Sequence, residues 1–168
     1  MPTVYMFQKR ISRRLEHMRF KSIFFSHNFP VSLEQEALVK TVEAWITKRG
    51  IVCHTVRNFA TNEGPAITRI RRKIDASDAV IALALPKAPR AREGDVMETE
   101  YGTQTTPWVH MEAAMAIQAG KPLALIKDAR LPQDGIFDVS ATGLPVLELG
   151  CEVTLEEFQE MLDSLSFS

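Results

Sequence analysis

Short apolar runs alternate with amphipathic segments along this chain, and that alternation constrains the fold more than any other feature. Residues 79–85 are continuously apolar, which is typical of a central strand in a parallel sheet covered on both faces. Shorter strands are predicted at four more places, residues 22–25, 51–56, 123–126 and 146–149. Helical patterns lie between the runs. We therefore expect an α/β fold, a flavodoxin-like five-stranded parallel sheet flanked by helices.

Capping patterns mark where several helices begin. Ser32 with Gln35, and Thr154 with Glu157, have the spacing of capping boxes. Pro65 is suited to the start of a helix. In that helix three isoleucines are predicted to face inward, namely Ile67, Ile70 and Ile74.

The two ends of the chain differ in charge. Residues 5–18 are predicted as a basic amphipathic helix, whereas the last eighteen residues carry acidic side chains and no Lys or Arg. We expect residues 1–20 to form a basic N-terminal helical extension on one domain, residues 21–168. Opposite charges at the two ends can favour contact between them or between subunits, although solvated faces explain them more simply.

Composition excludes several classes of function. The 168 residues carry a net charge of -1, so no overall basic field attracts nucleic acid or an acidic membrane. No apolar stretch is long enough to span a membrane, and the N-terminus lacks an apolar signal core. Cys53 and Cys151 lie far apart without metal-ligand spacing. We expect a cytoplasmic protein without a metal, a resident cofactor, a nucleic-acid partner or a membrane partner.

Glu112 is the candidate catalytic residue. It is the only carboxylate on a segment that begins with Thr106 as N-cap and Pro107 at the first helical position, and that ends before Gly120. The segment is apolar nearly all the way round, which predicts burial on several sides. A lone buried carboxylate costs free energy unless it is paired or protonated, so such a group often serves chemistry. The alternative is a structural Glu that caps a neighbouring loop.

The motifs that the sequence lacks exclude several kinds of catalysis, and the position of Trp108 indicates another. No phosphate-binding glycine loop, zinc-binding motif or serine-nucleophile elbow occurs in the sequence. Trp108 lies one helical turn before Glu112, so the two residues share a helix face. A purine or pyridine ring can stack on the indole while the carboxylate faces a ribose, an arrangement that suits cleavage of a glycosidic bond. Core packing is the simpler explanation of Trp108 by itself.

Several segments, taken in order, resemble those of a Toll/interleukin-receptor (TIR) domain. They are Phe24-Phe25-Ser26-His27, then Ser77-Asp78-Ala79-Val80-Ile81, then the run from Pro107-Trp108-Val109-His110-Met111-Glu112 through the following alanines to Gly120-Lys121-Pro122. The resemblance covers about residues 21–165, and the Trp-Val-His-x-Glu run is its most specific part. Without receptor or leucine-rich segments, the chain is similar to stand-alone bacterial-type TIR proteins of the NAD-cleaving branch.

The resemblance implies that Glu112 cleaves the nicotinamide–ribose bond of NAD, as an NAD glycohydrolase or an ADP-ribosyl cyclase. NAD would then be a substrate and not a cofactor. Trp108 would line the nucleotide site, and further contacts are implied for the ends of the first two strands, at Phe25, Ser26, His27, Asn28, Asn58 and Phe59. Arg57, Arg90 and Arg92 are candidates for phosphate by charge alone. The resemblance also implies homo-oligomers through TIR–TIR contacts and a role in antiviral defence, with a separate effector protein reading the product.

Two other functions fit the same residues. A nucleoside deoxyribosyltransferase or nucleotide N-glycosidase would keep the flavodoxin-like sheet and the catalytic glutamate and change the substrate. A non-catalytic TIR module would bind other TIR domains through residues 58–64, and Glu112 would then be structural. The long polar segment 86–106 runs directly into the helix of Glu112, and a loop of this length is usually functional.

Overall fold

The fold is an α/β sandwich built on one parallel sheet. The computed structural model describes residues 20–56, 64–87 and 104–168. Within these residues five strands pair in parallel in the order β2-β1-β3-β4-β5. This is the flavodoxin-like strand order, so the predicted fold class is confirmed. The strands are β1 (Ser22–His27), β2 (Val52–His54), β3 (Ala79–Ala84), β4 (Leu123–Asp128) and β5 (Val146–Leu149).

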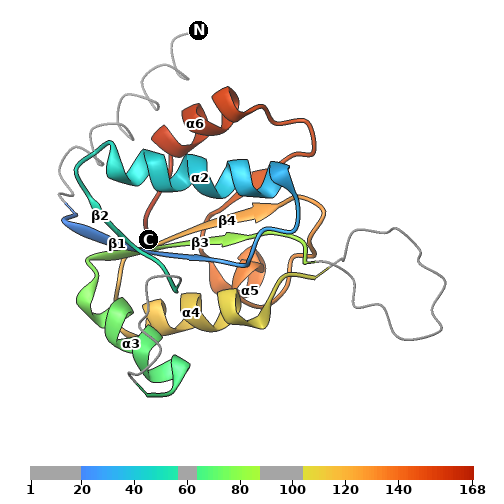
Figure 1. The fold of residues 1–168 in the computed structure, drawn as a ribbon. Helices are drawn as coiled ribbons and strands as arrows, with labels where there is room; N and C mark the ends of the chain where they lie inside the picture. The colour runs from blue at the N-terminus through green and yellow to red at the C-terminus, as the bar shows by residue number, and fades with distance from the viewer. Residues whose placement is uncertain (1–19, 57–63, 88–103) are drawn as a thin grey trace, which may run out of the picture.

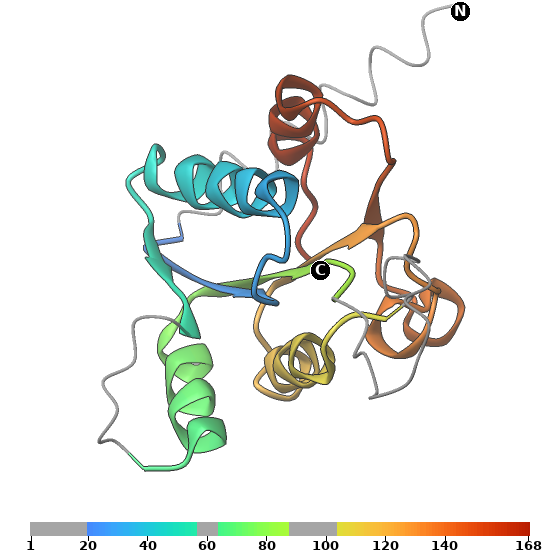
Figure 2. The same ribbon diagram turned by 45° about the vertical axis from the view of Figure 1, so that its right-hand side comes forward.

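Helices cover both faces of the sheet (Figures 1 and 2). On one face lie α2 (Leu33–Thr47) and α6 (Leu155–Asp163), and on the other lie α3 (Ala66–Ala76) and α4 (Pro107–Gln118). Between β4 and β5 the chain adds a 3-10 turn, η2 (Gly135–Phe137), and a one-turn helix, α5 (Val139–Thr142), neither of which we predicted.

Each face of the sheet has its own hydrophobic core, because successive side chains of a strand point to opposite faces. In β1, Phe25 belongs to the core under α2 and α6, whereas Phe24 belongs to the core under α3 and α4. The next residue along β1, Ser26, is fully buried as well. Strand alternation therefore directs Ser26 to the side of the sheet that α4 covers.

The predicted capping boxes differ in outcome. Thr154 and Glu157 form the reciprocal box at the start of α6, as predicted. At α2 only half of the box forms, since Ser32 accepts from the Gln35 N–H at 3.2 Å. The buried Gln35 side chain instead accepts from the Val31 N–H at 3.0 Å and donates to the Pro86 carbonyl at 2.9 Å. Gln35 thus joins α2 to the chain that leaves β3.

Helix α4 begins as predicted but is buried on one side only. Thr106 accepts from the Trp108 N–H at 3.4 Å, and Gly120 follows the helix with φ +63°. The prediction of burial on several sides is wrong, because Trp108 is 43% and Ile117 47% exposed. Alanines pack the buried stripe closely against the sheet, which leaves the larger apolar residues on the outside.

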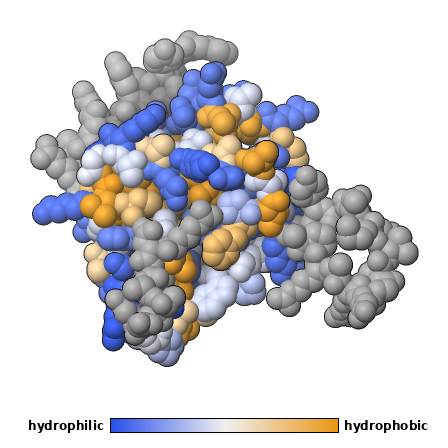
Figure 3. All heavy atoms as spheres, in the orientation of Figure 1, coloured by the Kyte–Doolittle hydropathy of each residue, from blue (hydrophilic) through white to orange (hydrophobic). Residues whose placement is uncertain are grey.

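The inward-facing prediction for the helix after Pro65 holds in part. Ile70 and Ile74 are buried, but Ile67 is 45% exposed in the first turn of α3. In the orientation of Figure 1, the surface of the molecule has apolar residues interspersed with hydrophilic ones (Figure 3). Among the described residues, none of the helices is long and apolar enough to cross a membrane. The predicted N-terminal helix at residues 5–18 lies outside the described residues.

Candidate functional site

The candidate site centres on a buried contact between a helix and a strand. Glu112, in the second turn of α4, is 3% exposed, and Ser26, in β1, is fully buried. The Ser26 hydroxyl donates a hydrogen bond to Oε2 of Glu112. Ser26 lies near the carboxyl end of its strand, which is where ligands bind in sheets of this kind. No ion pair to Glu112 is present among the described residues.

Burial controls the protonation of Glu112. Loss of hydration disfavours the charged carboxylate and raises the pKa of Glu112 from 4.5 to about 7. The hydrogen bond from Ser26 acts in the opposite direction and lowers the pKa, but it is the smaller effect. Near neutral pH both the carboxylic acid and the carboxylate are therefore populated, which suits acid–base catalysis, and the carboxylate form can act as a nucleophile.

Trp108 lies one helical turn before Glu112, where the sequence places it. The structure does not support the simpler explanation of core packing, because Trp108 is 43% exposed. An indole with this exposure can stack on the ring of a ligand, at the end of the helix that points to the carboxyl edge of the sheet. Its separation from Glu112 is four residues, about 6 Å along the helix axis.

The sequence neighbours of Ser26 that were predicted to contact the substrate differ in their surroundings. Phe25, which the resemblance placed at the substrate, is fully buried in the core under α2, because strand alternation turns it away from Ser26. His27 stacks on Phe25 with ring centroids 4.7 Å apart, and its Nδ1 lies 2.9 Å from the Asn28 carbonyl oxygen. Asn28 is 6% exposed, and its Oδ1 accepts from the Leu85 N–H at 3.0 Å. Ser26 thus contacts Glu112, Asn28 follows two residues later at the end of β1, and Phe25 packs the core.

The other residues implied for the site lie outside the described residues. This applies to Asn58 and Phe59 after β2, and to Arg57, Arg90 and Arg92 as candidates for phosphate. Their contribution stays a prediction. Within the described ranges, no cluster of three or more His, Cys, Asp or Glu side chains could hold a metal ion.

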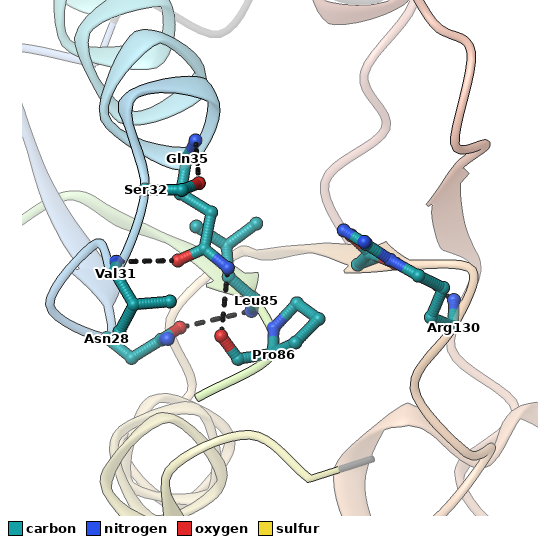
Figure 4. A network of polar contacts seen from close by, with 8 residues as sticks. Asn28, Val31, Ser32, Gln35, Leu85, Pro86 and Arg130 are labelled. Carbon is teal, nitrogen blue, oxygen red and sulfur yellow. Dashed lines mark hydrogen bonds and ion pairs between the residues drawn. The ribbon is translucent and has the colours of Figure 1, made fainter. Parts of the chain in front are cut away.

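A polar network after β3 was not predicted (Figure 4). Three consecutive residues form backbone hydrogen bonds there. The Leu85 N–H donates to Asn28, and the Pro86 carbonyl accepts from Gln35. The Lys87 N–H donates to the Gln104 carbonyl at 3.0 Å. Arg130, beyond the end of β4, appears in the same view, and its guanidinium holds Asp128 through bonds of 2.9 and 2.6 Å. The sequence signal for this network is weak, since isolated Asn and Gln residues rarely indicate a tertiary contact.

A cavity of about 390 Å³ lies on the other flank of α4. His110 lines it and is two residues, about 200° round the helix, from Glu112. The buried Lys127 ammonium forms part of the wall, donating to the Leu131 carbonyl at 2.8 Å and lying 3.1 Å from Glu148. The other lining residues include Lys87, Thr105, Pro107 and Phe137. Glu112 does not line this cavity, so we keep it separate from the candidate site.

Comparison with known proteins shows the fold and goes no further. No known protein family matches the sequence, and no curated protein matches it either. Among solved structures the chain is similar to a CMP N-glycosidase, BcmB, from Clostridium botulinum. The two share 16% identity with a TM-score of 0.54, and the match covers 85% of this chain and 98% of that one. The fold therefore spans nearly the whole of an enzyme named for cleaving a nucleotide.

Proposed function

We propose that this protein is a nucleotide N-glycosidase, an enzyme that hydrolyses the bond between base and ribose, with Glu112 as the catalytic carboxylate. The observation that carries the proposal is a glutamate 3% exposed, with a pKa near 7, oriented by the hydroxyl of Ser26 at the carboxyl edge of a parallel sheet. Similarity to the CMP N-glycosidase supports the same bond class and favours a nucleoside monophosphate as substrate.

The chemistry needs this carboxylate, a proton for the departing base and one water molecule. The ionised Glu112 stabilises positive charge on the ribose as the C1′–N bond breaks, or attacks C1′ and forms a glycosyl-enzyme. In both routes the electron pair of the broken bond leaves with the base, which gains a proton when it is released as a neutral pyrimidine. Water then adds to C1′, gives up a proton and leaves ribose 5-phosphate with Glu112 restored.

NAD is the second candidate substrate. Nicotinamide leaves a cationic pyridinium as a neutral molecule, so its departure needs no acid, and one carboxylate suffices. The exposed Trp108 one turn before Glu112 offers a surface on which the pyridine or adenine ring can stack. With NAD as substrate, the TIR resemblance leads us to propose assembly into homo-oligomers and a role in antiviral defence. The product would be ADP-ribose or a cyclic isomer read by an effector.

The test is a base-release assay with purified protein on CMP, other nucleoside monophosphates, nucleosides and NAD, at several protein concentrations and with a crowding agent. We expect free base from a nucleoside monophosphate, together with stoichiometric ribose 5-phosphate. Nicotinamide release with CMP untouched would move the assignment to NAD. If none of the substrates is cleaved and the protein associates with itself as its concentration rises, it is a non-catalytic interaction module.

A further inference from the structure

Asn28 carries a donor whose direction the surrounding protein fixes. Its Oδ1 accepts from the Leu85 N–H at 3.0 Å. Rotating the amide by 180° would place two N–H donors against each other, so Leu85 determines which amide atom is the oxygen. The nitrogen of Asn28, Nδ2, must therefore point away from Leu85. The amide can give hydrogen bonds from Nδ2, while Oδ1 is already occupied.

Nδ2 has no hydrogen-bond partner in the structure although it is buried. The residue as a whole is 6% exposed. A buried donor without an acceptor is unfavourable, so buried amides of this kind usually have a partner in the working state of the protein. Beside a candidate active site, the natural partner is an acceptor oxygen of the substrate.

The position of Asn28 relative to Glu112 indicates which part of a substrate it meets. Asn28 is two residues beyond Ser26, directly after the end of β1. If strand geometry continues for one residue, the two Cα atoms are about 6.6 Å apart, which is close to the span of a ribose with its hydroxyls. Ser26 holds Glu112 and so marks where C1′ must lie. With C1′ at Glu112, Asn28 is at the right spacing along the chain to meet another atom of the same sugar.

We propose that Asn28 is a positioning residue that donates from Nδ2 to a hydroxyl oxygen of the substrate ribose. This inference rests on the proposed function and adds a selectivity to it, since a site with a buried donor rejects an analogue that lacks the acceptor. The enzyme then prefers ribonucleotides to the deoxy analogue lacking that hydroxyl. Ser26, Asn28 and Glu112 are all buried, so the three belong to one dry region of the protein.

The test compares Asn28→Asp with the wild-type protein on a ribonucleotide and on its 2′-deoxy and 3′-deoxy analogues. The aspartate keeps an acceptor for the Leu85 N–H and removes the donor. Gln118→Glu, the same change on the exposed face of α4, is the matched control. Rates are taken on the high-pH plateau, because the added charge raises the pKa of Glu112. Removing a hydroxyl also alters the intrinsic reactivity of the sugar, but this effect cancels when the two enzymes are compared.

We expect one of the two analogues to lose about 10- to 100-fold in kcat/KM with the wild-type enzyme. The same analogue should lose only a few-fold with Asn28→Asp, and the control should behave like wild type. The hydroxyl that shows this coupling is the one that Asn28 meets. Equal losses in wild type and Asn28→Asp for both analogues would overturn the inference and leave the glycosidase assignment standing.

If Asn28→Asp does not fold, a second measurement tests the proposed contact between Asn28 and the ribose. Glu112→Gln protein is titrated with the ribonucleotide and both analogues by calorimetry. Weaker binding of one analogue by about tenfold or more supports the inference, whereas equal binding of all three overturns it. If the wild-type protein cleaves no nucleotide at all, the proposed function fails and this inference fails with it.

Discussion

At the scale of single residues, two opposing effects set the protonation of Glu112. Burial raises the pKa of this side chain to about 7, and the Ser26 hydroxyl partly opposes the rise. The sequence indicated Glu112 because a lone carboxylate on an apolar helix is unusual. It could not show that Ser26 would be the partner, since the two residues are 86 positions apart and meet only when α4 packs on β1.

The pH dependence of catalysis tests this balance. If the carboxylate form of Glu112 acts, kcat/KM should rise with pH and level off about one unit above pH 7. Ser26→Ala removes a hydrogen bond that favours the charged form, so the rising limb should move to higher pH. A pH–rate profile of both proteins measures the shift. A limb that stays at the same pH in Ser26→Ala would show that another group titrates.

Stability should respond to the same pKa. With a folded-state pKa raised from 4.5 to about 7, Glu112 keeps its proton in the folded protein after the unfolded chain has lost it. Its contribution to stability thus falls as pH rises through this window. Glu112→Gln has no such loss. Its free energy of unfolding, taken relative to that of wild type, should therefore be about 3 kcal/mol higher at pH 8 than at pH 4. Urea unfolding at several pH values measures the gain. A constant difference would mean that Glu112 titrates normally.

At the scale of secondary-structure elements, predictions from local sequence pattern succeeded where contacts between sequence neighbours determine the structure. Residues 146–149 and the Thr154 box were predicted correctly because strand pattern and capping depend on neighbours in sequence. Gln35 does not complete the capping box because its Oε1 accepts from the Val31 N–H, while its Nε2 donates to the distant carbonyl of Pro86. Ile67 and Ile117 follow a helical apolar pattern but lie beyond the reach of the core.

The packing of α4 against η2 provides a prediction at this scale. Gly135 has φ +52°, and a Cβ there would lie 2.8 Å from Nδ1 of His110, whose ring also packs edge-on against Phe137 at 5.3 Å. Gly135→Ala should therefore cost both backbone strain and displacement of the ring, about 2–4 kcal/mol in total.

Gly143→Ala is the matched control for that variant. Gly143 has φ +68° with nothing within 4 Å of the added Cβ, so only the backbone strain of about 1–2 kcal/mol applies. Chemical denaturation of both variants gives the comparison. Equal losses of stability would mean that His110 moves aside freely and does not fix α4 against η2.

At the scale of the whole molecule, the alternation of apolar runs was enough to predict the five-stranded parallel sheet, and the sheet in turn predicts the edge where the site lies. Tertiary details were not predictable in the same way. The unpartnered Asn28 nitrogen and the cavity across α4 arise from segments far apart in the chain. The similarity to a CMP N-glycosidase covers 85% of this chain and shows the fold.

The most direct test of the central claim is base release by wild-type protein and by Glu112→Gln, measured side by side on CMP and NAD at pH 8. Loss of an acting carboxylate should reduce turnover by about 100- to 1,000-fold, in keeping with the size of other single-residue catalytic effects, while circular dichroism and urea unfolding show an intact fold. Cleavage by Glu112→Gln at a rate near that of wild type would contradict the assignment of Glu112 as the catalytic residue.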